Sequence, residues 1–325
     1  MSSGRRTRWG ILGAANIARG QFMPGLRESG DGVAAVVASR DLARAQAFAH
    51  AEGVERAVDD YRAVLADAEI DAVYIPLPNS LHAQWTLEAL YAGKHILCEK
   101  PLCASLAETE TVIATARSHP EAPLWEAFVF PFQAQHARVL ELIAEGAIGT
   151  LREIHSAFHF ALRATEDIRL SAELGGGALA DVGCYPIRLG HELLGPVGGP
   201  LSLEGRVEGE VEVDATAIVS HGDQRLVLTC GFERPYDTFT RLLGEGGRLH
   251  LTNPFHPGPD DRLEIHRPGA EPVVEYPTRD ARSFTAALRH IHAVVRGEEE
   301  PRHPAVDSAL STAATLAALQ DLVAA

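Results

Sequence analysis

The length, composition and charge of the chain exclude several classes of protein. Its 325 residues suffice for two domains of ordinary size, and a hydrophobic content of 46% excludes a disordered chain. The 44 acidic residues against 29 basic ones give a formal net charge of −15, which disfavours nucleic acids and anionic membrane surfaces as partners. Four cysteines without ligand spacing exclude a disulfide scaffold and predict reduced, mostly buried thiols.

The start of the sequence lacks a convincing export signal. Arg5-Arg6 precedes an apolar stretch, but glycines break that stretch and no small-residue cleavage site follows it. No apolar run approaches the ~20 residues that a membrane span needs. We therefore expect a cytoplasmic protein.

Short apolar runs alternate with helical stretches in the N-terminal third, which is typical of βαβ units around a parallel sheet. The predicted strands are 9–12, 33–38, 72–75, 95–98 and 124–128, and the predicted helices are 16–29, 42–52, 80–92 and 106–118. The repetition predicts an α/β fold in which residues 1–125 form a doubly wound, NAD(P)-binding Rossmann domain.

Alternating polar and apolar residues dominate the remainder of the chain, as in an antiparallel sheet with one covered face. The predicted strands are 152–160, 201–213, 215–220, 226–232, 248–252 and 263–266, followed by helices at 283–296 and 304–324. We predict that residues 126–325 form an α+β domain with a large, mostly antiparallel open sheet.

A run of small residues directly after the first predicted strand indicates a dinucleotide-binding turn. Gly13-Ala14-Ala15-Asn16-Ile17-Ala18 is a Gly-x-Ala-x-x-Ala variant of the fingerprint that lets a backbone approach a pyrophosphate at a helix N-terminus. The alternative is a tight strand-to-helix turn without a ligand. The strand before the run, the helix after it and the βα repeats favour the nucleotide.

The residues after the second predicted strand favour NADP over NAD. An NAD site usually has an acidic residue here, which accepts a hydrogen bond from the ribose 2′-hydroxyl. This chain has Ser39 and Arg40, with Arg44 one helical turn later, and a hydroxyl and guanidinium groups suit a 2′-phosphate. The alternative for Arg40 is a solvated surface side chain.

Two further turns are expected at the same edge of the parallel sheet, because ligands lie beyond the carboxyl ends of such strands. After the third and fourth strands we place these cofactor-binding candidates: Leu77, Pro78, Asn79, His82, Glu99 and Lys100. A lysine in such a turn can donate to a substrate hydroxyl. Pairing of Lys100 with Glu99 at the surface is the alternative.

A glycine-rich turn at residues 175–177 leads into a predicted helix that contains Asp181 and Tyr185. Because these two residues are four apart, they project from one face of the helix. A tyrosine near an ammonium group can give and take a proton, since the positive charge lowers the pKa of the phenol. A structural hydrogen bond between the two side chains is the alternative.

These motifs together resemble the Gfo/Idh/MocA family, the group of glucose-fructose oxidoreductase and inositol dehydrogenase, and particularly its sugar and dihydrodiol dehydrogenase branch. The resemblance rests on the residues from Trp9 to Ala18, Glu99-Lys100-Pro101, Glu126-Ala127-Phe128, and the segment from Gly175 to Tyr185. It extends over essentially the whole chain. It implies a Rossmann domain followed by an α+β domain that serves substrate binding and oligomerisation.

The resemblance also implies roles for three residues. Lys100, Asp181 and Tyr185 would surround the reacting carbinol, with Tyr185 as the proton relay while hydride moves between the nicotinamide and a sugar carbon. Lys100 would lower the pKa of Tyr185 and hold the substrate hydroxyl, and Asp181 would orient both. A dimer or tetramer formed through the C-terminal sheet is implied as well.

The chain departs from this branch after Phe128. Relatives usually continue with an aromatic residue, an Arg and Phe-His-Pro, whereas this chain has Phe130-Pro131-Phe132-Gln133-Ala134. Substrate identity therefore does not carry over, although a small sugar-like molecule is expected. His155 and His159 alternate along a strand, so we predict no metal site.

The sequence therefore predicts an NADP-dependent oxidoreductase acting on a secondary alcohol or keto group of a sugar, polyol or dihydrodiol, with NAD as the alternative cofactor. Two other functions stay open. One is a catalytically idle nucleotide-binding regulator, which would be expected to lack the Lys or the Tyr. The other is a glycoside-cleaving enzyme that keeps its cofactor tightly bound and uses transient oxidation.

Overall fold

The structure is a computed structural model that describes residues 5–164, 166–196 and 201–324. The chain forms two compact units. The first comprises the residues up to Val129 together with Arg282–Ala309, and the second comprises Phe130–Ala281 and the residues from Leu310 onward. The sequence-based division into 1–125 and 126–325 did not anticipate that residues 282–309 belong to the first unit.

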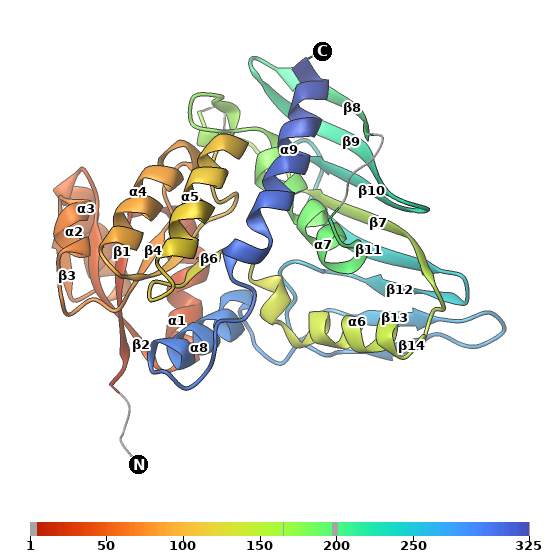
Figure 1. The fold of residues 1–325 in the computed structure, drawn as a ribbon, viewed down its shortest axis with the longest axis horizontal. Helices are drawn as coiled ribbons and strands as arrows, with labels where there is room; N and C mark the ends of the chain where they lie inside the picture. Colours follow the sequence, from red (N-terminus) through yellow and green to blue (C-terminus); the bar gives the residue numbers. More distant parts are fainter. Residues whose placement is uncertain (1–4, 165, 197–200, 325) are drawn as a thin grey trace. The chain divides into compact units, whose positions relative to one another are not determined.

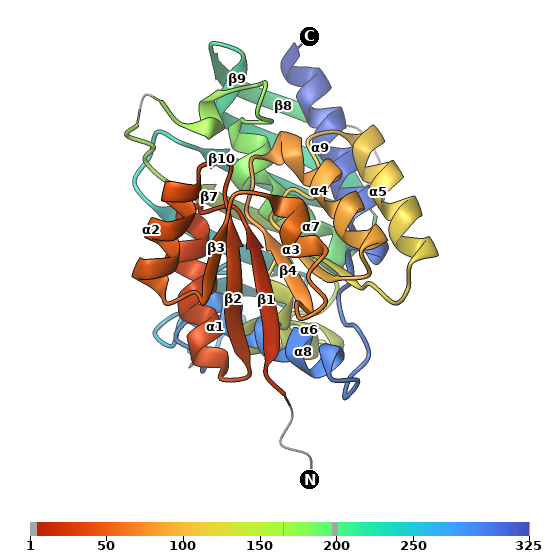
Figure 2. The ribbon, with the colours of Figure 1, turned by 90° about the vertical axis from the view of Figure 1, so that its left-hand side faces the viewer.

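The first unit contains a six-stranded sheet in the order β3-β2-β1-β4-β5-β6 (Figure 1). Every pairing in this sheet is parallel. Figure 2 shows β3, β2, β1 and β4 side by side. The strands are β1 Thr7–Leu12, β2 Gly32–Ala38, β3 Arg56–Val58, β4 Ala72–Ile75, β5 His95–Cys98 and β6 Leu124–Glu126.

Helices connect the strands of the first unit, and their boundaries follow local chemistry. The helices are α1 Met23–Ser29, α2 Leu42–Glu52, α3 Tyr61–Leu65, α4 Asn79–Tyr91, α5 Leu106–Ser118 and α8 Ser283–Val295. The Asp41 carboxylate caps α2, and Ser105 and Glu108 form a capping box on α5. A π-helical turn, Ala18–Phe22, precedes α1, and Pro24 occupies the first turn of α1, where no amide hydrogen is required.

The helix α8, from late in the chain, completes the core of the first unit. It packs against α1, and the Trp9 indole N–H donates to His292 Nε2 over 2.9 Å in a fully buried position. A Cβ at Gly25 would lie 2.7 Å from Phe284 Cβ, and one at Gly32 would lie 2.7 Å from the His292 ring. The two glycines therefore let α8 approach closely.

The second unit contains an eight-stranded sheet in the order β14-β13-β12-β11-β7-β10-β9-β8. All of its pairings are antiparallel except that between β7 and β10. The strands are β7 Leu151–His159, β8 Leu201–Glu208, β9 Val211–His221, β10 Gln224–Gly231, β11 Asp237–Gly244, β12 Gly247–Leu251, β13 Leu263–His266 and β14 Val273–Glu275. Both this sheet and the parallel one confirm the predicted fold class.

Two helices of the second unit are linked by buried polar side chains. These are α6 Ala134–Ala144 and α7 Cys184–Leu194, and the unit also contains most of α9 Ala309–Ala324. His136 Nε2 of α6 lies 2.7 Å from a Glu192 carboxylate oxygen, and Arg188 donates to the other oxygen over 2.6 Å. Because Arg188 and His136 are each only about 5% exposed, the pairing satisfies groups that burial would otherwise penalise.

Several predicted elements were wrong in their boundaries or absent. The predicted strand 201–213 is a hairpin, because Gly209 adopts a φ of +62° and turns the chain between β8 and β9. The predicted helix 304–324 begins only at Ala309, after a 3₁₀ turn at Ala305–Asp307. The strands β3, β11 and β14 and the helices α3 and α6 were not predicted. The four cysteines are buried and free, as predicted.

The buried His292 predicts a pH-dependent stability of the first unit. Burial lowers the pKa of His292 to about 4, so the unfolded chain takes up a proton below pH ~6.5 before the folded chain does. Unfolding should therefore become easier by about 2 kcal/mol between pH 7 and pH 5 from this residue alone. Urea unfolding followed by tryptophan fluorescence measures it, because Trp9, Trp85 and Trp125 all lie in the first unit.

The His292→Gln variant should lose the share of this pH dependence that His292 contributes, while the buried His82, His95 and His290 retain theirs. The exposed His50 provides the matched control, because His50→Gln should leave the pH dependence unchanged. Equal pH dependence in the wild type and His292→Gln would contradict the assignment.

Candidate functional site

The Gly13 turn lies where β1 ends, and its conformation requires glycine. Gly13 has a φ of +124°, and a Cβ there would lie 3.1 Å from Leu77 Cδ2 and 3.4 Å from the Pro76 carbonyl oxygen. The Gly13 amide donates to the Ala38 carbonyl at the end of β2 over 2.9 Å. Asn16 and Ile17 are exposed at the start of the following helix. The turn thus presents accessible backbone at a helix N-terminus, as a pyrophosphate requires.

The three polar residues after β2 lie next to that turn. An Arg44 guanidinium N–H donates to the Ala14 carbonyl over 3.2 Å, which ties the first turn of α2 to the Gly13 turn. The Ser39 hydroxyl is mostly buried and accepts from the Asp41 amide over 3.4 Å. Arg40 is exposed and has no hydrogen-bond or ion-pair partner among the described residues. An uncompensated guanidinium here fits a bound phosphate.

His82 of α4 connects the turns after β4 and β5. Its ring is fully buried, with Nδ1 2.8 Å from the Pro101 carbonyl oxygen and Nε2 2.8 Å from the Leu77 carbonyl oxygen. Burial lowers the pKa of His82, so the neutral ring donates to one carbonyl at a time. His82 was predicted as a cofactor-binding residue, but its ring nitrogens face the chain's own backbone. Leu77, Pro78 and Asn79 are half-exposed in the turn itself.

Buried carboxylates fix the turn that contains Lys100. The Tyr74 hydroxyl donates to Glu99 over 2.6 Å, and the Lys100 amide donates to the other oxygen of Glu99 over 3.3 Å. Glu126 of β6 accepts from the Leu102 amide over 2.8 Å. The peptide bond between Lys100 and Pro101 is cis. Because the turn is anchored at both ends, its backbone is held at a defined position. Lys100 itself is half-exposed.

The glycine-rich turn of the second unit docks against backbone and a buried carboxylate. The Gly177 amide donates to the Arg169 carbonyl over 2.8 Å, and a Cβ at Gly176 would lie 2.4 Å from that oxygen. A Cβ at Gly177, whose φ is +109°, would lie 2.4 Å from Glu212. Glu212 accepts from the Leu179 amide over 2.9 Å, at the start of the π-helical turn Leu179–Gly183. This turn carries Asp181 and leads directly into α7.

Arg169 holds the Asp181 carboxylate, a contact that the sequence did not suggest. Arg169 Nε donates to Asp181 over 2.7 Å, and its Nη1 donates to Asp167 over 3.1 Å. The guanidinium also lies over the Phe160 ring, 5.7 Å from its centroid. Twelve positions separate Arg169 from Asp181, and no spacing rule links them. Arg169 thereby fixes the orientation of Asp181.

Tyr185 lies in an aromatic enclosure and contacts a histidine that sequence reasoning missed. The residue is 5% exposed, and its ring centroid is 5.2 Å from those of Phe158 and Phe255. Its hydroxyl is 3.1 Å from His256 Nε2. His256 comes from the loop after β12, 71 positions later in the chain, so only the fold brings the two together.

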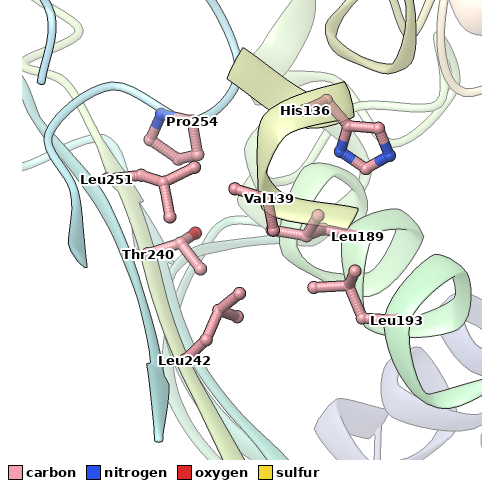
Figure 3. Close-up of a pocket in the computed structure, with 8 residues that line it drawn as sticks. All are labelled: His136, Val139, Leu189, Leu193, Thr240, Leu242, Leu251 and Pro254. Carbon is pink, nitrogen blue, oxygen red and sulfur yellow. The ribbon is translucent and has the colours of Figure 1, made fainter. Parts of the chain in front are cut away.

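A small pocket in the second unit is separate from these residues. Leu189 and Leu193 of α7 face Thr240 and Leu242 of β11 across it (Figure 3). The lining is mostly apolar, and the remaining lining residues are His136, Val139, Leu251 and Pro254. It contains none of the predicted site residues.

Within the described residues, no cluster of three His, Cys, Asp or Glu side chains suits a metal ion, and no helix is long and apolar enough to cross a membrane.

Comparisons with known proteins agree with the motifs in both units. Residues 7–127 match the oxidoreductase family with an NAD-binding Rossmann fold, and residues 136–250 match the Gfo/Idh/MocA C-terminal domain. The chain belongs to the Gfo/Idh/MocA family. This finding confirms the predicted family and the prediction of an NAD(P)-dependent dehydrogenase or reductase.

Similar members of the family act on sugars. A dTDP-3,4-didehydro-2,6-dideoxy-α-D-glucose 3-reductase from Streptomyces antibioticus is 40% identical over 296 residues, which cover 87% of this chain and 89% of the relative. A D-xylose 1-dehydrogenase (NADP⁺) from Haloferax volcanii is 34% identical over 92% of this chain and 91% of its own. A 3-ketoreductase from Actinomadura kijaniata, crystallised with NADP and TDP-benzene, is 33% identical, with a TM-score of 0.87 over 97% of each chain.

The position of His82 predicts that it orients the Lys100 turn. In His82→Leu, both ring contacts are lost at little change in volume, so we expect turnover to fall roughly 10- to 100-fold and NADPH to bind more weakly by fluorescence titration. His82→Gln retains an N–H donor and should recover part of both losses. His95→Leu, at the opposite end of β5, is the control for lost stability. Unchanged turnover and NADPH affinity in His82→Leu would contradict the role.

Proposed function

We propose that this member of the family is an NADP-dependent oxidoreductase that transfers a hydride between the nicotinamide and a secondary alcohol or keto group of a sugar. The observation that carries the proposal is that one chain has both Lys100, on the anchored turn after β5, and Tyr185, whose hydroxyl is enclosed in the second unit. An idle regulator would not need to retain both groups. Relatives that are named sugar reductases and dehydrogenases support the same reading.

The residues of the first unit fit NADP. The Gly13 turn would receive the pyrophosphate, while Ser39, Arg40 and Arg44 would hold the 2′-phosphate. The strongest support is Arg40, because the guanidinium lacks a carboxylate partner among the described residues although the chain has a net charge of −15. When bound, the reduced nicotinamide supplies the hydride.

The protein groups supply proton transfer and orientation. In the reductive direction, the Tyr185 hydroxyl gives its proton to the carbonyl oxygen, which becomes the hydroxyl of the product. The Lys100 ammonium donates a hydrogen bond to the same oxygen and stabilises the negative charge that develops there. Asp181 orients these groups, and Arg169 in turn keeps the Asp181 carboxylate in place.

For the substrate, we propose a keto sugar joined to a nucleoside diphosphate. The support is the printed activity of the Streptomyces antibioticus relative and the bound TDP-benzene in the Actinomadura kijaniata enzyme. An NADPH absorbance assay with nucleotide-linked 3-keto sugars, free xylose and dihydrodiols distinguishes these three substrate classes. Oxidation of xylose alone would favour the dehydrogenase activity of the Haloferax relative instead.

Arg40 should select NADPH over NADH. Loss of the guanidinium in Arg40→Ala should weaken NADPH binding roughly 10- to 100-fold and leave NADH binding within about twofold, because charged hydrogen bonds contribute ~1.5–3 kcal/mol. Fluorescence titration measures both dissociation constants. Arg27→Ala is the control, since Arg27 pairs with Glu52 on the surface. Equal losses for the two cofactors would refute the assignment.

Lys100 and Tyr185 should be required for turnover but not for cofactor binding. Lys100→Met and Tyr185→Phe should each reduce kcat by at least ~100-fold, the usual size of a lost proton-transfer group. The NADPH dissociation constant should stay within about threefold. Tyr91→Phe is the matched control, because Tyr91 is 68% exposed. Turnover retained by either of the first two variants would remove that residue from the mechanism.

A further inference from the structure

The enclosure of Tyr185 raises the question of how its hydroxyl is reprotonated after each turnover. The residue is 5% exposed, and Phe158 and Phe255 cover its ring. A phenolate formed there has little direct access to bulk water. His256 Nε2, 3.1 Å from the hydroxyl oxygen, offers a route, because His256 itself is half-exposed.

The loop after β12 holds the His256 backbone through Asn253. The His256 amide donates to Asn253 Oδ1 over 3.3 Å, and Asn253 Nδ2 donates to the His256 carbonyl over 2.7 Å. Asn253 Nδ2 and the Gly258 amide also donate to Asp261 over 3.1 and 2.8 Å. The backbone of the loop is therefore fixed, and Nε2 is directed to the Tyr185 hydroxyl.

The chemistry of the surrounding groups distinguishes His256 from its neighbours. The ionisable side chains around it include Tyr185, Asp261 of the same loop, and Tyr236, whose ring meets Phe158 edge-on. A carboxylic acid or a phenol ordinarily titrates far from neutrality, whereas an imidazole exchanges protons there. An imidazole is therefore the kind of side chain best suited to carry protons at neutral pH.

We propose that His256 is a proton-relay residue that acts through Tyr185, an inference that rests on the proposed role of Tyr185 as proton donor. After Tyr185 has given its proton to the substrate oxygen, the His256 imidazolium transfers its Nε2 proton to the phenolate oxygen. The N–H bond breaks, the phenol O–H bond forms again, and the neutral imidazole then takes a proton from water. In the oxidative direction the proton moves outward by the same steps.

The relay predicts a kinetic signature that simple misplacement of Tyr185 would not produce. In His256→Ala, Tyr185 begins each reaction protonated, so the first turnover should be as fast as in the wild type. Later turnovers should be slower by roughly 10- to 100-fold, because they wait for reprotonation. Stopped-flow NADPH fluorescence should thus show a burst of about one equivalent per site, followed by a slow steady state. Imidazole in the buffer should restore the steady-state rate.

Controls separate this inference from the proposed function. Tyr185→Phe should show neither a burst nor rescue by imidazole, and His155→Ala, altered at a histidine of β7 that pairs with Glu153, should behave as the wild type. A His256→Ala variant with wild-type steady-state turnover, or one with slow first turnover and no rescue, would overturn the relay alone. Full turnover by Tyr185→Phe would instead overturn the proposed role of Tyr185.

Discussion

The parallel direction of every strand in the first sheet is the constraint on which the cofactor half of the site depends. Because β1, β2, β4 and β5 all end at one edge, the turns after them are neighbours although they are up to 87 positions apart, from Gly13 to Lys100. Direct contacts bear this out: Arg44 reaches the Ala14 carbonyl, and Leu77 fills the space that a side chain at Gly13 would need. The His82 ring contacts backbone carbonyl groups of both the turn after β4 and the turn after β5.

The candidate functional groups of the second unit, Asp181 and Tyr185, are positioned in a different way. They do not follow the ends of parallel strands; they follow a glycine turn that packs closely against neighbouring residues. Gly177 leaves room for the Glu212 carboxylate, which satisfies a free amide at the start of the helical segment. Burial raises the pKa of Glu212, and the bond to the Leu179 amide opposes that rise. The direction in which Asp181 and Tyr185 project thus depends on Glu212, a residue of β9 that acts through the Leu179 amide.

The sequence was informative where local rules apply. The parallel strands are continuous apolar runs, and the Gly13 and Gly175–Gly177 turns have signatures that follow from backbone geometry. The strand β11 was missed because Thr238 and Thr240 occupy two of its three buried positions, so the polar and apolar residues do not alternate clearly in the sequence. Elements as short as β3 and α3 show too little periodicity to recognise. Arg169 and His256 were missed because their contacts join loops whose pairing only the tertiary fold determines.

The return of the chain into the first unit has a consequence for how the protein is made. Trp9 lies fully buried against His292, which is 283 positions later, and Gly25 and Gly32 are shaped to receive α8. During synthesis, this surface of the N-terminal sheet therefore stays uncovered until Phe130–Ala281, the larger part of the second unit, has been made. Because that part of the second unit lies between two segments of the first, its slow folding prolongs the exposure of this surface.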